Sequence, residues 1–367
     1  MKCEWEECTL DTIMTFKNGK ARPPQTGQFP VYGGNGVLSS ANQYNSENCI
    51  VIGRVGVYCG SVYFEKGKCW ISDNAICGIP KGKNDAEYLY YLLCSLKLNK
   101  RRIGTSQPLL TQEILRKIGV IIPPENQQKK ISRVLRCLDD EIELNNAINN
   151  NLERQAQALF KSWFIDFEPF GGTMPNDWKY TTLGEVTTNL RSKITLPNTP
   201  VFSAINTGCL QLSDEHFTKQ VYSKDKSKYI LVNPGNFAYN PARINIGSIG
   251  LNEFDFAGCV SPVYVAFSVK EEYQAFFRFY FKTSTFKENC KSRSSGSVRQ
   301  SLNYSEFSLI YICYPSIEWA KRFNDIWHSY FLKINQNDEE NKKLMGIRDV
   351  LLSRLMSGEL DVSDINI

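Results

Sequence analysis

The sequence predicts an α+β fold in which two mixed α/β globular domains are separated by two long antiparallel coiled-coil helices, in a pseudo-two-fold, near-cyclic arrangement. The main observation is an internal repeat, because residues 118–164 recur as residues 310–356 at a constant offset of 192. Residues 5–10 also resemble residues 178–183, at an offset of 173. Both copies end in a seven-residue apolar period. A duplicated unit of one domain and one helix predicts two similar heads at a fixed separation.

The first globular domain, which we call head one, is expected at residues 1–122. The segment 48–64 is rich in Val, Ile and Tyr and is broken by Gly, which predicts two strands joined by a turn. Residues 69–79 predict a further strand, and residues 85–98 predict a helix that begins at an acidic cap. A basic loop, residues 97–108, follows.

The second globular domain, head two, is expected at residues 171–315. It repeats the same order, with a strand pair at 236–251, a strand at 258–267, a helix at 271–282 and a basic loop at 287–300. The two offsets differ by 19, so the stretch between the matched start and the matched arm is 19 residues longer in head two than in head one. The similarity is weak inside the heads and strong in the helices, which indicates heads that differ in what they contact.

The two helical arms are expected at residues 123–170 and 316–360, with a short tail at 361–367. Each arm has a seam position every seven residues, namely Ile131, Leu138, Asn145, Leu152 and Leu159, and then Phe323, Tyr330, Asn337, Leu344 and Leu351. Five heptads favour a coiled coil, and the alternative is an ordinary long helical hairpin. A seam asparagine in each arm, Asn145 and Asn337, is expected to fix the register at some cost in stability.

Large apolar side chains gather where the first arm meets head two, at Phe160, Trp163, Phe164 and Phe167. Two interpretations stay open. The residues form a patch on which another subunit docks, or they fix the arm to head two.

The composition is that of a globular protein of two or three domains, with 367 residues, 42% of them hydrophobic and 22% charged. The net charge of +5 permits a nucleic-acid partner without requiring one. No apolar run approaches the ~20 residues of a membrane helix, and the first six residues contain no apolar signal core. We therefore expect a cytoplasmic protein without a membrane partner.

The chain lacks the sequence patterns of the common catalytic and metal sites. Its twelve cysteines form no Cys-x-x-Cys pair, and only His216 and His328 could assist them, so we expect reduced thiols and no metal site. No phosphate-binding loop, dinucleotide fingerprint or nucleophile elbow occurs. We expect a non-catalytic protein that holds no cofactor of its own.

Several segments resemble the specificity subunit of type I restriction–modification enzymes. The resemblance covers nearly the whole chain. The central conserved region of that family is resembled by four segments: Ile121-Ile122-Pro123-Pro124, Gln127-Gln128-Lys129-Lys130-Ile131, residues 138–146 and residues 157–160. The distal conserved region is resembled by residues 351–360. The target-recognition domains of the family are resembled by residues 53–56, 70–74, 247–250 and 260–264. One departure is Ser316, where the first copy has Pro124.

The resemblance implies a reader of double-stranded DNA in which each head recognises one half of a bipartite site and the arms set the gap. It also implies two modification (methyltransferase) subunits that carry S-adenosylmethionine, and restriction subunits that use ATP and magnesium. The alternatives are a rigid interaction scaffold without DNA binding, and an autonomous DNA methyltransferase or nuclease.

DNA readers need cations for phosphates and planar donors for base edges. Arg side chains can form two hydrogen bonds with the edge of guanine, and Asn or Gln side chains can do so with the edge of adenine. The candidates in head one are Arg54, Lys100, Arg101, Arg102, Thr105, Ser106 and Gln107, and those in head two are Arg191, Lys193, Arg243, Asn245, Arg293, Ser297, Arg299 and Gln300.

Overall fold

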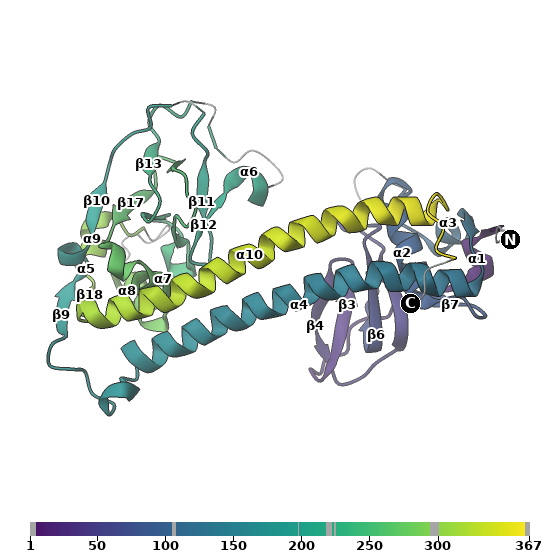
Figure 1. The fold of residues 1–367 in the computed structure, drawn as a ribbon, viewed down its shortest axis with the longest axis horizontal. Coiled ribbons are helices and arrows are strands. Elements are labelled where there is room, and N and C mark those ends of the chain that lie inside the picture. Colours follow the sequence, from purple (N-terminus) through teal and green to yellow (C-terminus); the bar gives the residue numbers. More distant parts are fainter. Residues whose placement is uncertain are drawn as a thin grey trace. The chain divides into compact units, whose positions relative to one another are not determined.

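The computed structural model describes residues 5–104, 108–196, 198–217, 222–223, 225–293 and 301–363. The chain divides into two compact units, the first from residues 1–146 and 337–367 and the second from residues 147–336. Helices α4 (Glu125–Phe164) and α10 (Ile317–Met356) each contribute a segment to both units (Figure 1). The predicted mixed α/β fold with two long helices is confirmed. The domain boundaries and the near-cyclic arrangement stay predictions.

The first unit contains a curled, mainly antiparallel sheet and short helices. Its strands are β1 (Glu6–Thr9), β2 (Met14–Asn18), β3 (Phe29–Gly33), β4 (Gly36–Ala41), β5 (Ser46–Gly53), β6 (Val62–Ile71), β7 (Ala75–Pro80) and β8 (Gly119–Ile122). Its short helices are α1 (Leu10–Ile13), α2 (Ala86–Ser95), η1 (Leu98–Lys100) and α3 (Gln112–Arg116). Six strands pair in the order β2-β7-β5-β6-β3-β4, and β1 pairs separately with β8.

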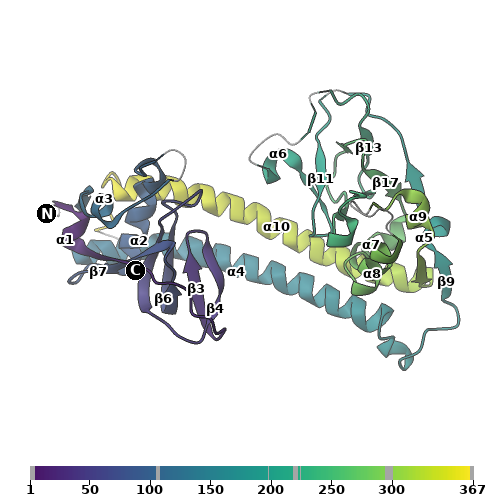
Figure 2. The same ribbon diagram turned by 180° about the vertical axis from the view of Figure 1, so that it is seen from behind.

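Helix α2 packs against the six-stranded sheet on one side and contacts helix α4 on the other (Figure 2). It begins at Asp85, whose carboxylate accepts the backbone N–H of Tyr88 at 2.7 Å, as the acidic cap predicted. The Tyr91 hydroxyl donates to Asp139 of α4 at 2.6 Å. Arg348 of α10 donates to the same carboxylate at 2.9 Å. One carboxylate therefore joins head one to both long helices.

The long helices run antiparallel within the first unit. Asp139 contacts Arg348, and Asn145 contacts Asn341, so residue numbers rise along one helix as they fall along the other. The Nδ2 of Asn145 donates to the Oδ1 of Asn341 at 3.1 Å, and both side chains are buried. A buried amide pair is satisfied in one register only, so it specifies how the two helices align.

The second unit is built from shorter strands. These are β9 (Lys179–Thr182), β10 (Thr188–Leu190), β11 (Phe202–Ala204), β12 (Leu210–Leu212), β13 (Ile230–Val232), β14 (Phe237–Tyr239), β15 (Ile249–Leu251), β16 (Gly258–Val260), β17 (Val265–Ser268) and β18 (Tyr311–Tyr314). Its helices are η2 (Glu168–Phe170), α5 (Leu183–Val186), α6 (Ser213–His216), η3 (Ile244–Ile246), η4 (Glu271–Tyr273), α7 (Gln274–Tyr280), α8 (Ser284–Arg293) and α9 (Tyr304–Ser308). Four strands form a sheet in the order β10-β17-β14-β15, and β11-β12, β13-β16 and β9-β18 pair separately.

Aromatic packing joins α7 to the long helices in the second unit. Phe160 of α4 lies 5.7 Å from Phe323 of α10 and 5.6 Å from Phe276 of α7, measured between ring centroids. Trp163 of α4 meets Trp319 of α10 edge to face at 4.9 Å. The partners again run in opposite directions, so α4 and α10 are also antiparallel in this unit.

The internal repeat is visible in the backbone at the start and the end of each head. The N–H of Leu10 donates to Ile118 at 2.9 Å, and the N–H of Leu183 donates to Ile310 at 2.9 Å. These are the positions that the offsets of 173 and 192 relate. Each head is thus closed by the same antiparallel pair, β1 with β8 and β9 with β18. The sheet orders β2-β7-β5-β6 and β10-β17-β14-β15 also correspond.

Three predicted elements differ from the structure. The strand predicted at 69–79 is broken by a turn at 72–75, and the one predicted at 258–267 is broken by a turn at 261–264. Pro262 and the pair Asp73-Asn74 favour turns over a continuous strand. The predicted basic loop at 287–300 is helical up to Arg293, because Ser284–Arg293 forms α8 and buries Phe286 and Cys290.

Candidate nucleic-acid interface

Three segments that carry exposed polar side chains meet at one end of the sheet in the first unit. Strand β2 ends at Asn18, close to its partner Ile76, and β5 ends at Gly53, opposite Ala75. Both strands therefore end where β7 begins. The residues that follow β2, follow β5 and precede β7 lie together, and we call this region the sheet-end surface of head one.

Arg54 lies in this surface and is held by its backbone. Its N–H donates to the carbonyl oxygen of Asn74 at 3.0 Å, and its own carbonyl oxygen accepts the N–H of Leu110 at 2.9 Å. The side chain is half-buried, and its Nε has no hydrogen-bond partner among the residues that the structure describes. An unpaired buried donor is costly, so this guanidinium is incompletely satisfied in the free protein.

The basic loop of head one borders the same surface. Its three described candidates all have exposed side chains: Lys100, Arg101 and Arg102. The loop packs against the connection between β5 and β6 so closely that a Cβ on Gly60 would lie 2.4 Å from the nitrogen of Asn99. The N–H of Gly56 donates to Pro108 at 3.0 Å and ties the far end of the loop to the same connection. The candidates Thr105, Ser106 and Gln107 lie outside the described residues.

The second unit has the corresponding sheet end. Leu190 at the end of β10 lies opposite Ala266, and Tyr239 at the end of β14 lies opposite Val265. Arg191 follows Leu190 directly, and its side chain is exposed. The residues after β10, after β14 and before β17 form the sheet-end surface of head two.

Arg243 and Asn245 are carried by the connection between β14 and β15. The N–H of Asn240 donates to Ser248 at 3.0 Å, and the N–H of Ser248 donates to Arg243 at 3.1 Å, so the connection closes on itself. Arg243 is exposed and Asn245 is half-buried. Both residues therefore lie at the sheet-end surface of head two.

The remaining candidates of head two are more scattered. Lys193 is exposed and pairs with Ile230 beside β13. Arg293 is half-buried at the end of α8, which packs against η3 of the Arg243 connection. Ser297, Arg299 and Gln300 lie outside the described part of the chain. The structure thus gathers Arg191, Arg243 and Asn245, and it places Arg293 on a neighbouring helix.

Sequence reasoning missed residues that the structure places at the sheet end of head one. Lys20 follows β2, is exposed, and donates its N–H to Ile71 at 3.0 Å. Asn74 precedes β7 and is also exposed. The offset of 173 relates Lys20 to the candidate Lys193, so the repeat itself contained the signal for Lys20.

The heptad seam is buried unevenly. Ile131, Asn145, Phe323 and Asn337 are buried, whereas Leu138, Leu152, Leu159, Tyr330, Leu344 and Leu351 are half-buried. Leu135, Ala156 and Trp327, which each lie four residues after a seam residue, are also buried. Burial at both positions of a heptad is what a two-helix coiled coil requires.

The assignment of Phe160, Trp163, Phe164 and Phe167 to a docking patch needs correction. Phe160 and Phe164 are buried in the core of the second unit, and Trp163 and Phe167 pack against that core half-buried. Phe164 stacks on Trp178 at 5.6 Å, next to strand β9. These side chains fix the arm to head two, and Phe160 and Phe164 expose too little surface to receive another subunit.

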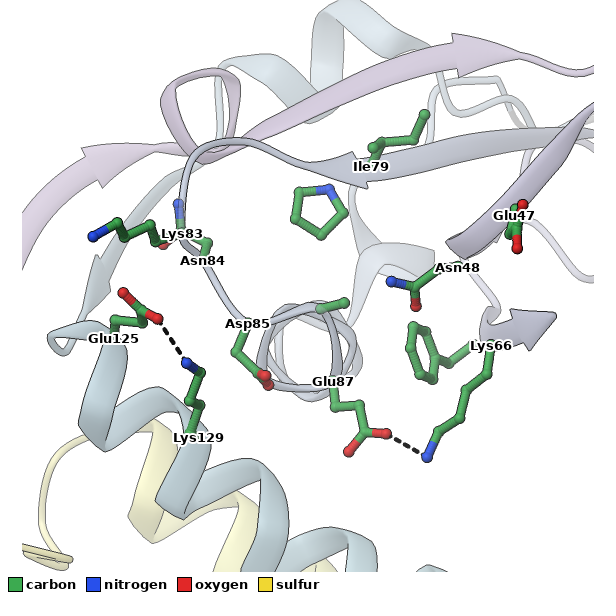
Figure 3. A pocket seen from close by; sticks show the side chains of 13 residues that line it. Glu47, Asn48, Lys66, Ile79, Lys83, Asn84, Asp85, Glu87, Glu125 and Lys129 are labelled. Carbon is green, nitrogen blue, oxygen red and sulfur yellow. Dashed lines mark hydrogen bonds and ion pairs between the residues drawn. The ribbon is translucent and has the colours of Figure 1, made fainter. Parts of the chain in front are cut away.

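The opposite end of the first sheet carries acidic side chains around a pocket. A pocket of about 660 Å³ lies there, between the start of β5, the start of α2 and the first turn of α4 (Figure 3). Two ion pairs cross its wall, Lys66 with Glu87 at 2.6 Å and Lys129 with Glu125 at 2.7 Å. Asp85 adds a further carboxylate. Carboxylates repel phosphates, so this pocket is a poor nucleic-acid site.

No cluster of His, Cys, Asp and Glu able to hold a metal ion occurs in the described ranges. Among the cysteines that the structure describes, only Cys137 is exposed. A hydrogen bond with Cys69, together with burial, raises the pKa of Cys49 to about 12, which disfavours the thiolate needed for metal binding. No helix within the described residues is long and apolar enough to cross a membrane.

Comparison with known proteins adds to this geometry. Residues 2–154 match the family model described as the type I restriction modification DNA specificity domain. The chain is 27% identical to the type I restriction enzyme MjaIX specificity subunit of Methanocaldococcus jannaschii, over 78% of this chain and 72% of that protein. It is 26% identical to the HindI specificity subunit of Haemophilus influenzae, over 75% of this chain and 77% of that protein.

The fold also matches a solved structure. The crystal structure of the S subunit of a type I restriction–modification system from M. genitalium gives a TM-score of 0.62 at 17% identity, and the match covers 96% of both chains. At this identity the likeness concerns the fold alone.

Proposed function

We propose, from the premise that this chain belongs to the family of type I restriction–modification specificity subunits, that each head reads one half of a bipartite site on double-stranded DNA. One observation carries the proposal. The two heads share a sheet topology, and in both of them cationic side chains lie at the same sheet end. Cations that neutralise phosphates position a protein on DNA, and polar side chains between them contact base edges.

In this proposal the helices set the gap between the half-sites. The buried Asn145–Asn341 pair supports it, because the pair fixes the register of α4 against α10. A rigid antiparallel pair gives a spacing that does not vary from molecule to molecule. The gap should therefore be a constant number of base pairs.

The proposed partners are two modification (methyltransferase) subunits, which carry S-adenosylmethionine, and restriction subunits, which use ATP and magnesium. The second half of α10 offers an exposed apolar stripe made of Gly346, Ile347 and Val350, with the half-buried Leu351 beside it. Ile347 and Val350 are 51% and 58% exposed. An apolar stripe on a helix suits the apolar face of a partner helix. It replaces Phe160 and Phe164 as the support for subunit docking.

The chain itself is proposed to be non-catalytic. The rival functions are a scaffold without DNA binding and an autonomous DNA methyltransferase or nuclease. Purified chain, incubated alone with DNA and S-adenosylmethionine, should transfer no methyl group. Methyl transfer without a partner subunit would establish the second rival, and an absence of salt-dependent DNA binding would establish the first.

The experiment that tests the DNA surface is the double change Arg101→Ala/Arg102→Ala. If both residues contact phosphates, the affinity falls on all sequences, and the slope of log K against log salt falls by about one per lost contact. The matched control is Lys66→Ala/Lys83→Ala, which removes two exposed cations from the opposite sheet end. Equal effects of the two double variants would mean that net charge, and not this surface, binds DNA.

A further inference from the structure

Both heads present a two-residue turn at the same point of the fold. In head one the N–H of Ala75 donates to Ser72 at 3.0 Å and closes a turn whose tip is Asp73-Asn74. In head two the N–H of Tyr264 donates to Ser261 at 2.9 Å and closes a turn whose tip is Pro262-Val263. Strand β7 of head one and the corresponding strand β17 of head two begin at the ends of these turns. Both tips have exposed side chains, and Val263 is 67% exposed.

The turn occupies the middle of each sheet-end surface. Strand β7 lies between β2 and β5, and β17 lies between β10 and β14. In head one the cations Lys20 and Arg54 follow the two flanking strands, and in head two Arg191 and Arg243 do so. Neighbouring strands are ~4.8 Å apart, so the ends of the two flanking strands lie about one strand spacing from each turn.

The backbone of the turn is fixed while its tip side chains stay exposed. Ser72 is fully buried, and its N–H donates to Tyr32 at 2.9 Å. The carbonyl oxygen of Asn74 accepts the N–H of Arg54 at 3.0 Å. Because this backbone is already fixed, contact between a tip side chain and a base requires no further ordering of the loop, and this favours binding.

The chemistry of the two tips differs although their backbones correspond. Head one has a carboxylate and an amide, and head two has two apolar side chains. The Asp73 carboxylate would be repelled by a phosphate, and it can accept a hydrogen bond from the amino group of cytosine. The tip of head one is therefore suited to base edges and unsuited to the DNA backbone.

We propose that the tip of this turn is a base-reading position in both heads. The Asn74 amide forms paired hydrogen bonds with the N6 and N7 of an adenine, and the Val263 side chain contacts the 5-methyl group of a thymine. The cations on both sides hold the phosphates. This inference rests on the proposed function, because it assigns a role within the DNA surface proposed for each head.

The test uses the full chain and a library of double-stranded DNA with both half-sites randomised. Asn74→Ala should reduce discrimination at one base pair of one half-site by roughly 5- to 150-fold and leave the other half-site and the gap unchanged. Val263→Asn should change preference at one base pair of the other half-site. The matched control is Asn126→Ala, at an exposed position in the first turn of α4, which should change neither.

The outcomes separate the inference from the proposed function. If Asn74→Ala and Val263→Asn both keep the wild-type preference at every base pair, the turns do not read bases, although the chain still binds DNA. A uniform loss of affinity on all sequences would also overturn the inference, because it indicates a phosphate contact. Absence of salt-dependent binding by the wild-type chain would instead refute the proposed function. The two variants lie in different heads, so a folding failure of one leaves the other decisive.

Discussion

Arg278 is a buried cation of the second unit that pairs with two carboxylates. Its side chain is 6% exposed, its Nε donates to Glu253 at 2.8 Å, and its Nη1 donates to Glu153 of α4 at 2.9 Å. The guanidinium carbon also lies 4.1 Å from the ring centroid of Trp327 on α10. Burial raises the pKa of Glu253, and the nearby charge of Arg278 opposes that rise. The network therefore joins head two to both long helices.

The change Arg278→Met keeps much of the side-chain volume and removes the charge. It leaves the Glu253 carboxylate buried without its cation, and removing one partner of such a pair costs about 3–5 kcal/mol. Glu153 keeps Lys282 as a partner at 2.6 Å, so Glu153 loses less stabilisation than Glu253 does. For a unit of this size 1 kcal/mol corresponds to about 2–4 °C, so the Tm of the second unit should fall by roughly 6–20 °C. Differential scanning calorimetry measures this shift.

The loss should depend on pH in a defined direction. Without Arg278 the pKa of Glu253 in the folded state rises further above the unfolded value of about 4.3. When the pKa of a carboxyl group is higher in the folded state than in the unfolded state, the group lowers the free energy of unfolding. This destabilisation is complete at pH values above the folded-state pKa, and it disappears as the pH falls to the unfolded-state pKa. The difference between variant and wild type should therefore be largest near pH 8 and shrink towards pH 4.5.

Two further variants complete the experiment. Adding Glu253→Gln to Arg278→Met removes the unpaired charge and should recover most of the lost Tm. Arg322→Met is the matched control, because Arg322 is exposed on α10 beside Trp319, and it should cost no more than about 1 kcal/mol. A Tm loss for Arg278→Met that stays constant from pH 8 to pH 4.5, or that Glu253→Gln does not reduce, would refute this account of the network.

Two further predictions concern the heads and the arms. Replacing residues 1–122 by the corresponding head of a relative should change only one half-site in a selection from randomised DNA, and a change in both would show that the heads do not read independently. Inserting seven residues after Asn149 and seven after Gln336 preserves the heptad seam and the Asn145–Asn341 pair and lengthens each helix by ~10.5 Å, so the preferred gap should grow by roughly three base pairs. Selection from a library of variable gaps measures this, and an unchanged gap contradicts the proposal that the arms set it.

The elements that depend on local pattern could be predicted from the sequence. The heptad period from Ile131 to Leu159 located α4, because helical periodicity is expressed in neighbouring residues. The acidic cap at Asp85 located α2 for the same reason. The correspondence of the heads also followed from the sequence, since the offsets of 173 and 192 relate Leu10 to Leu183 and Ile118 to Ile310.

Features set by contacts between distant segments could not be predicted in this way. The turn at Asp73-Asn74 interrupts an apolar run, and its position depends on pairing of β7 with both β2 and β5. The sequence around Phe160 and Phe164 is compatible with exposed or with buried side chains. Their burial follows from contacts with aromatic side chains on α7 and α10, which are distant in the sequence. The offset of 173 could have identified Lys20 as a candidate, but only the register places it beside the turn.

The closure of each head has an evolutionary consequence. In head one the strand that opens the domain, β1, pairs along its whole length with β8, the strand that leads into α4. In head two β9 pairs with β18 in the same way. Two genetic crossovers, one within the coding segment of each closing strand, would exchange everything between them and keep the closing pair. Under the proposed function, such an exchange would change one half-site and would require no new adaptation of the helices.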